Sequence, residues 1–103
     1  MTDFARLRPH QLQAAIAANT PVVLPIGVME YHGLHLPAGV DLLAVTEVLA
    51  RLGDQIITLP PFAYGAASHA VAGPEGTGTL HIDAGAILPL AEALFTALLK
   101  AGF

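Results

Sequence analysis

The sequence contains no cysteine and only four lysine and arginine residues among 103. Without thiolates, the cysteine-based zinc sites and iron–sulfur clusters are excluded, and the lack of cysteine fits a cytoplasmic protein. The formal net charge of -4 argues against a nucleic-acid surface. No uninterrupted apolar run approaches the roughly 18 residues that span a bilayer, and no basic segment leads into an apolar one as in a secretory signal. We therefore expect no nucleic-acid partner and no membrane partner.

Charged residues make up only 12% of the chain, while hydrophobic residues reach 54%. The charged fraction is below the quarter that is usual in globular domains, so little of the chain is suited to facing solvent. The length leaves room for one domain. These values predict a single, core-rich domain.

Metal-binding chemistry is concentrated in one short segment, residues 30–41, which reads Glu-Tyr-His-Gly-Leu-His-Leu-Pro-Ala-Gly-Val-Asp. It contains two carboxylates and two imidazoles. An apolar run, residues 22–27, precedes it, and a helix-like run, residues 42–52, follows it. We therefore expect a strand, a loop and a helix N-terminus.

The spacing of the polar residues suits a metal site. In an extended chain, residues i and i+2 point to the same side about 6.5 Å apart, so Glu30 and His32 can converge on one centre or on two metals held about 3.5 to 4 Å apart. Asp41 occupies the expected helix N-cap, where its short carboxylate would face the loop. Imidazole and carboxylate ligands without thiolates favour Zn, Mn or Fe.

Each of these residues also has a structural interpretation. Asp41 can be a helix cap, Glu30 a surface carboxylate, and His32 and His35 ordinary loop residues. Taken together the metal interpretation is favoured, because clustered ionisable groups in a buried loop are costly unless they are used. We predict metal ligands at Glu30, His32 and Asp41.

The remaining chain alternates between strand-like and helix-like segments. Short apolar runs typical of buried parallel strands flank a helical run that Gly53 ends, which predicts a right-handed βαβ unit. Asp83 can cap a last helix, which Pro89 would kink or delay. We expect helices starting near Arg8, over residues 42–52 and after Asp83, and strands over residues 22–25, 55–59 and 79–82.

The ligand pattern resembles a known family. Glu-x-His-Gly-x-His-Leu-Pro followed by Gly-x-Asp, entered from an apolar run ending in Pro-x-Gly, is similar to the creatininase (creatinine amidohydrolase) family. Weaker resemblances follow in order at residues 60–65, at Ser68 and His69, and at the Gly-Thr-Gly-Thr-Leu segment of residues 76–80. The resemblance covers the chain from about Leu7 to Phe103. It implies an α/β layered fold with a parallel sheet, in which residues 1–103 form the N-terminal part of a creatininase-like metal-dependent hydrolase domain.

The resemblance also implies functional roles. Glu30 would bind one metal ion, His32 the other, and Asp41 would bridge the two, which would be Zn or Mn. His35 would act either behind the ligands or as a substrate contact. Ser68 and His69 could contact substrate, although a solvated loop is the alternative there. The implied activity is hydrolysis of a non-peptide or cyclic C–N amide bond in a small-molecule substrate by a metal-bound hydroxide.

The sequence departs from the family in what it lacks. Family members continue into a further strand and an Asn-Gly-His-Gly-Gly-Asn type loop that supplies the remaining metal ligands, and this chain contains neither. It is therefore expected to be a fragment or a shortened relative, with the general acid or base unassigned. The alternative function is a truncated, non-catalytic metal-binding relative that associates with a partner chain. Because two or three parallel strands cannot cover their own faces and edges, we also expect a homo-oligomer.

Two other features are given structural interpretations. Residues 73–79 are glycine-rich like a phosphate loop, but they lack its lysine and the strand that precedes it. His10 and His81 lie outside the resemblance and are interpreted as ordinary surface histidines.

Overall fold

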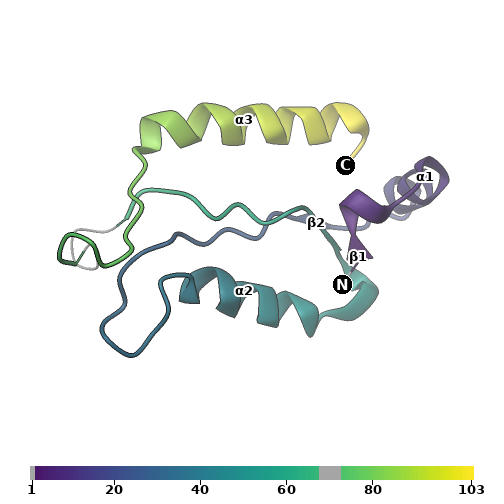
Figure 1. Ribbon diagram of the computed structural model, residues 1–103. Helices are drawn as coiled ribbons and strands as arrows, with labels where there is room; N and C mark the ends of the chain where they lie inside the picture. The colour runs from purple at the N-terminus through teal and green to yellow at the C-terminus, as the bar shows by residue number, and fades with distance from the viewer. Residues whose placement is uncertain (1, 68–72) are drawn as a thin grey trace.

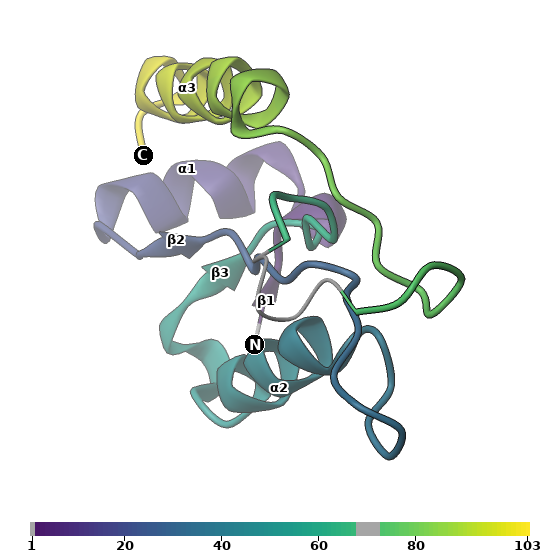
Figure 2. The ribbon, with the colours of Figure 1, turned by 90° about the vertical axis from the view of Figure 1, so that its left-hand side faces the viewer.

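The computed structural model describes residues 2–67 and 73–103, and the fold has three layers (Figure 1). A small parallel sheet lies between helix α2 on one face and helices α1 and α3 on the other (Figure 2). In chain order the elements are β1 (Thr2–Asp3), the 3₁₀ helix η1 (Phe4–Arg6), α1 (Pro9–Ala17), β2 (Val22–Val23), α2 (Val40–Ala50), the 3₁₀ helix η2 (Gly53–Gln55), β3 (Ile57–Thr58) and α3 (Ala84–Ala101). The predicted layered α/β fold with a parallel sheet is confirmed.

The described sheet has the strand order β1-β3-β2, and both pairings are parallel. Ile57 of β3 is in register with Thr2 on one side and with Val22 on the other. The strands β2 and β3 with the connecting helix α2 form the expected βαβ unit. Strand β1 was not predicted from the sequence, because its two residues carry no apolar run.

Strand pairing continues irregularly beyond β2 and β3. The N–H of Phe62 donates to the carbonyl of Pro25 at 2.8 Å, and the N–H of Gly27 donates to the carbonyl of Phe62 at 3.1 Å. The two chain segments therefore leave the sheet side by side. The strand expected at residues 79–82 is reduced to an isolated parallel bridge between Gly65 and His81.

The start of α2 corrects one prediction. The helix begins at Val40 with Gly39 as its N-cap, so Asp41 lies inside the first turn and makes no capping hydrogen bond. The physical reason is that its carboxylate faces His32, with Asp41 Oδ1 lying 3.1 Å from His32 Nε2. Asp41 belongs to the candidate site, and the helix start is left uncapped by a side chain.

The other helices begin close to where they were expected. Helix α1 has Pro9 at its first position. Helix α3 follows Asp83 and runs through Pro89, so the proline does not delay its start. Asp83 makes no capping bond, because its carboxylate is engaged with His81 at 2.9 Å.

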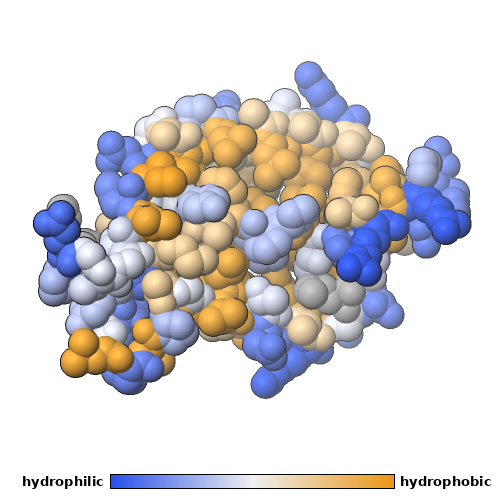
Figure 3. All heavy atoms as spheres, in the orientation of Figure 1, coloured by the Kyte–Doolittle hydropathy of each residue, from blue (hydrophilic) through white to orange (hydrophobic). Residues whose placement is uncertain are grey.

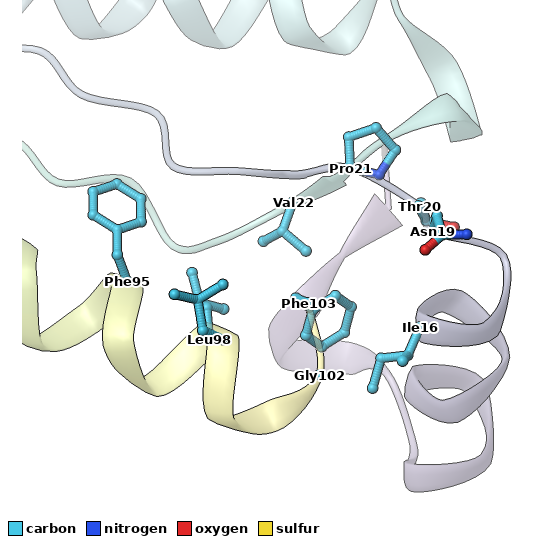
Figure 4. Close-up of a pocket in the computed structure, with 10 residues that line it drawn as sticks. Ile16, Asn19, Thr20, Pro21, Val22, Phe95, Leu98, Gly102 and Phe103 are labelled. Carbon is cyan, nitrogen blue, oxygen red and sulfur yellow. The ribbon is translucent and has the colours of Figure 1, made fainter.

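Helix α3 covers the sheet only in part. Its half-buried stripe consists of Ile87, Ala91, Leu94 and Leu98. An apolar cavity of about 290 Å³ lies between this stripe and the strand segments, and a second of about 410 Å³ lies between the ends of α1 and α3, with Val22, Phe95 and Phe103 around it (Figure 4). Hydrophobic side chains also gather on the outer surface over α3 (Figure 3). Among the described helices, α3 is long and apolar enough to cross a membrane by length and composition, a test that core helices of soluble proteins also pass.

Candidate metal centre

Glu30 and His32 follow β2, and Asp41 lies in the first turn of α2. The part of the connection that leads directly into α2, residues 29–39, is called the ligand loop here. It lies at the end of the sheet remote from both chain termini (Figure 1). One potential ligand atom from each of the three side chains lies within 4.8 Å of the others. The structure thus brings together the three residues that the sequence predicted as ligands.

A close backbone contact places α2 beside the ligand loop. A Cβ atom on Gly27 would lie 2.4 Å from the backbone nitrogen of Leu42 and 2.6 Å from its Cα. Only glycine permits this approach. The N–H of Glu30 also donates to the carbonyl of Ala38 at 2.9 Å, which closes the loop on itself. Together these contacts carry Asp41 back to the residues that follow β2.

The imidazole of His32 is held in one orientation. Its Nδ1 lies 3.0 Å from the backbone carbonyl of Glu30. Because a carbonyl only accepts hydrogen bonds, Nδ1 must carry the proton in the neutral ring, which leaves the lone pair on Nε2. That nitrogen lies 3.1 Å from Asp41 Oδ1 and 3.8 Å from Glu30 Oε1. Three electron-rich atoms therefore face one another, an arrangement that requires a positive charge between them.

The protonation of His32 reflects the same arrangement. The hydrogen bond to the Glu30 carbonyl raises the pKa of His32 above its ordinary value. Burial lowers this pKa, but the negative charges of Asp41 and Glu30 add to the upward shift and the net result is a raised pKa. The site therefore favours a cation, which is either a proton on His32 or a bound metal ion.

Glu30 supplies a further observation. Its side chain is buried, and within the described part of the chain its Oε2 atom has no hydrogen-bond partner. An unsatisfied buried carboxylate oxygen is costly, so this atom is suited to a ligand that the protein itself does not provide. Carboxylate oxygens and a neutral imidazole are the donors that Zn and Mn accept. The residues present therefore fit a divalent metal ion.

The other predicted site residues stand apart from this cluster. His35 is exposed, and its ring lies against the turn at Gly33, where φ is +84°. The structure does not bring it into the group formed by Glu30, His32 and Asp41. Ser68 and His69 lie outside the described residues.

Sequence reasoning missed a supporting segment, residues 79–83. The N–H of Tyr31 in the ligand loop donates to Thr79 Oγ1 at 3.0 Å. His81, interpreted from the sequence as an ordinary surface residue, accepts a hydrogen bond from the N–H of Ala67 at Nδ1 and contacts Asp83 through Nε2. The only sequence feature near this segment was the Gly-Thr-Gly-Thr run. Because that run contains no metal-binding side chain, it did not indicate that the segment supports a metal site.

Comparisons with known proteins agree with the geometry. The family model Creatininase, described as creatinine amidohydrolase, matches residues 5–103. Creatinine amidohydrolase of Pseudomonas putida is 29% identical over 97 residues, which cover 89% of this chain and 37% of that protein.

Solved creatininase structures have the same fold as this chain. A creatininase carrying a tryptophan-to-alanine mutation has a TM-score of 0.84 at 25% identity, and a crystal structure of creatinine amidohydrolase has a TM-score of 0.82 at 27% identity. Each comparison covers 98% of this chain but only 41% of the solved chain. The chain therefore spans about two fifths of the length of the relatives it matches. Because the family model covers nearly the whole sequence and the fold and ligand pattern agree with it, this chain belongs to the creatininase family.

Proposed function

We propose that this chain supplies the first ligands of a dinuclear metal centre in an amidohydrolase that cleaves a non-peptide or cyclic C–N amide bond of a small molecule. The observation that carries the proposal is the convergence of Glu30, His32 and Asp41, whose ligand atoms lie within 4.8 Å of one another in a chain of this family. The unpartnered buried oxygen of Glu30 supports it, since the described protein atoms leave that oxygen without a hydrogen bond.

The three side chains suit different roles in the proposed centre. Glu30 would hold one ion through its buried carboxylate, and His32 would hold the other through Nε2. Asp41, whose Oδ1 lies 3.1 Å from His32 Nε2 and whose carboxylate has a second oxygen to offer, would bridge the pair. When bound, Zn or Mn lowers the pKa of a coordinated water and polarises a carbonyl oxygen. The chain's own part is to place the proton of the neutral His32 ring on Nδ1, which leaves the lone pair on Nε2, and to hold both carboxylates in place.

Three ligands are too few for two catalytic ions. A catalytic zinc ion alone is usually held by three protein side chains, so a pair needs more than Glu30, His32 and Asp41 provide. The relatives extend well beyond the region matched here, because this chain covers only 37% to 41% of their length. We propose that residues equivalent to the unmatched region of those relatives supply the remaining ligands of the centre. We also propose that these 103 residues alone bind metal but do not hydrolyse substrate.

Turnover measurements test this proposal. The substrates are creatinine and small formamides with added Mn or Zn. The proteins are this chain alone, the chain joined after Phe103 to the C-terminal part of a creatininase, and the joined protein carrying Glu30→Gln. We expect metal-dependent hydrolysis only from the joined protein with Glu30 intact. Turnover by the 103 residues alone would contradict the proposal, and so would full activity in the Glu30→Gln protein.

The alternative is a non-catalytic metal-binding protein that associates with a partner chain. The favouring observation is that β2 has a regular strand partner on one side only within the described sheet, and that an apolar cavity adjoins it at Leu24 and Ile26. A joined protein that binds Zn but hydrolyses none of the substrates would favour this second function.

A further inference from the structure

The ligand loop is supported by residues far away in the sequence. Thr79 Oγ1 accepts the hydrogen bond from the N–H of Tyr31 at 3.0 Å, and the N–H of Leu80 donates to the carbonyl of Met29 at 2.9 Å. These bonds fix the backbone immediately after and immediately before Glu30. The supporting segment is thus placed to control the position of Glu30 without touching a metal ion.

The supporting segment is itself anchored. The N–H of Ile82 donates to the carbonyl of Gly65 at 2.9 Å, and His81 links Ala67 to Asp83. Gly78, with φ at +97°, turns the backbone immediately before Thr79. The backbone around Thr79 is therefore held in place by these contacts, and its hydroxyl is a fixed acceptor for the N–H of Tyr31.

A single peptide group connects Thr79 to His32. The N–H of Tyr31 and the carbonyl of Glu30 are the two ends of one planar, rigid peptide unit. Its N–H donates to Thr79 Oγ1, while its carbonyl accepts the hydrogen bond from His32 Nδ1 at 3.0 Å. Holding the N–H end in place therefore also orients the carbonyl that receives the histidine proton.

We propose that Thr79 is a positioning residue of the metal centre, which sets the tautomer and orientation of the His32 imidazole through the Glu30–Tyr31 peptide group. This inference rests on the proposed metal-binding function. Without the Thr79 hydroxyl the peptide group can rotate, and its carbonyl no longer selects the Nδ1–H form of the ring. The ring then populates the Nε2–H form, in which the nitrogen facing Asp41 and Glu30 has no lone pair for a metal. Loss of such a supporting bond typically weakens metal affinity by about 10- to 100-fold.

Three variants of the 103-residue protein separate this role from general stability. Thr79→Val removes the hydroxyl and keeps the shape of the side chain, and Thr79→Ser keeps the hydroxyl. Thr77→Val is the matched control, because the Thr77 hydroxyl donates to the carbonyl of Pro74 within its own turn. Cooperative unfolding of each protein shows whether it folds.

The first measurement is the tautomer of His32 in the metal-free protein. Nitrogen-15 NMR of the histidine rings at about pH 8.5, where imidazole is largely neutral, distinguishes Nδ1–H from Nε2–H. The His32 signal is identified by its loss in His32→Asn. We expect the Nδ1–H form in the wild type, in Thr79→Ser and in Thr77→Val, and a mixture of forms in Thr79→Val.

The second measurement is zinc affinity by calorimetry. We expect Thr79→Val to bind Zn about 10- to 100-fold more weakly than the wild type, with Thr79→Ser and Thr77→Val within about threefold of it. A Thr79→Val protein with wild-type tautomer and affinity would overturn the inference, as would a Thr79→Ser protein as defective as Thr79→Val.

The two proposals fail in different ways. A wild-type protein that binds no Zn refutes the metal-binding function, while the tautomer comparison still tests the role of Thr79. A wild-type spectrum with His32 mainly in the Nε2–H form refutes the role of Thr79 even if Thr79→Val does not fold.

Discussion

The Nε2 atom of His32 lies 3.1 Å from the Oδ1 atom of Asp41, although one residue belongs to the ligand loop and the other to the first turn of α2. The contact depends on Nδ1 of the same ring donating to the Glu30 carbonyl, which turns the lone pair of Nε2 towards the carboxylates. This relationship joins the ligand loop to the first turn of α2, and the first prediction tests it directly.

Asp41→Asn should weaken zinc binding and lower the pKa of His32. The hydrogen bond to the Glu30 carbonyl, which contributes most to the raised pKa, remains in this variant, but the substitution removes the negative charge of Asp41 that adds to it while keeping the shape of the side chain. Calorimetry should show a loss of affinity on the order of 10-fold or more, since a charged metal ligand becomes a neutral one. An NMR titration of His32 should show the lower pKa. Glu47→Gln, an exposed carboxylate on the same helix, is the control and should leave both values unchanged.

Metal affinity should fall as the pH is lowered. A proton and a metal ion compete for Nε2 of His32. Because the pKa of His32 is raised above its ordinary value of 6.5, the proton already competes with the metal above that pH. Below the raised pKa, the apparent affinity should decrease by up to about tenfold for each pH unit. Calorimetric titrations with Zn between about pH 5.5 and 8 check this slope, and an affinity independent of pH would argue that His32 is not a ligand.

Gly27→Ala should disturb both stability and the metal centre. The new Cβ would lie 2.4 Å from the nitrogen of Leu42, so the start of α2 must move and carry Asp41 away from His32. We expect a loss of about 1 to 3 kcal/mol in the free energy of unfolding, as for other overpacked sites, together with weaker zinc binding.

Gly85→Ala is the matched control for that substitution. A Cβ at this position in α3 meets nothing within 4 Å, so alanine should be neutral or stabilise the helix by up to about 1 kcal/mol. Chemical denaturation of both proteins gives the comparison. Equal stability of the two variants would show that the backbone contact at Gly27 does not matter.

The isolated chain should self-associate. Leu88 on α3 is 64% exposed, Leu99 is 73% exposed, and Ile26, three residues after the edge strand β2 of the described sheet, is 55% exposed. Exposed apolar surface next to an unpaired strand edge favours association. Sedimentation should show a mass that rises with concentration, and Ile26→Lys combined with Leu88→Lys should reduce it. The control is Leu34→Lys in the ligand loop, and a wild-type protein that stays monomeric at all concentrations would contradict the prediction.

The sequence predicted the parts of the site that are local in the chain. Glu30, His32 and Asp41 lie within twelve successive residues, so their spacing could be interpreted with strand and helix geometry alone. The predicted start of α2 was two residues too late, because the Asp41 side chain contacts His32 instead of capping the helix. His35 was expected near the site, but the turn at Gly33 leaves it exposed.

The supporting contacts could not be predicted in this way. The bond between Tyr31 and Thr79 joins residues 48 positions apart, and nothing in either local pattern indicates the other partner. The short strand β1 is defined by pairing with β3 and not by its own composition. Asp83 is a different case, because its carboxylate contacts His81 only two residues away instead of capping α3, so both of its possible partners are local in the sequence.

The ligand cluster and its support differ in how they are reached during folding. Bringing the three ligands together requires closure of one loop of about ten residues, which takes on the order of 10 to 100 ns. The contact between Tyr31 and Thr79 closes a much longer loop, so forming it costs more conformational entropy. The βαβ unit can therefore gather Glu30, His32 and Asp41 before the later segment arrives. A metal ion captured at that stage would add its binding energy to the folding of the first half of the chain, and the Thr79 segment would then dock against a surface that is already ordered.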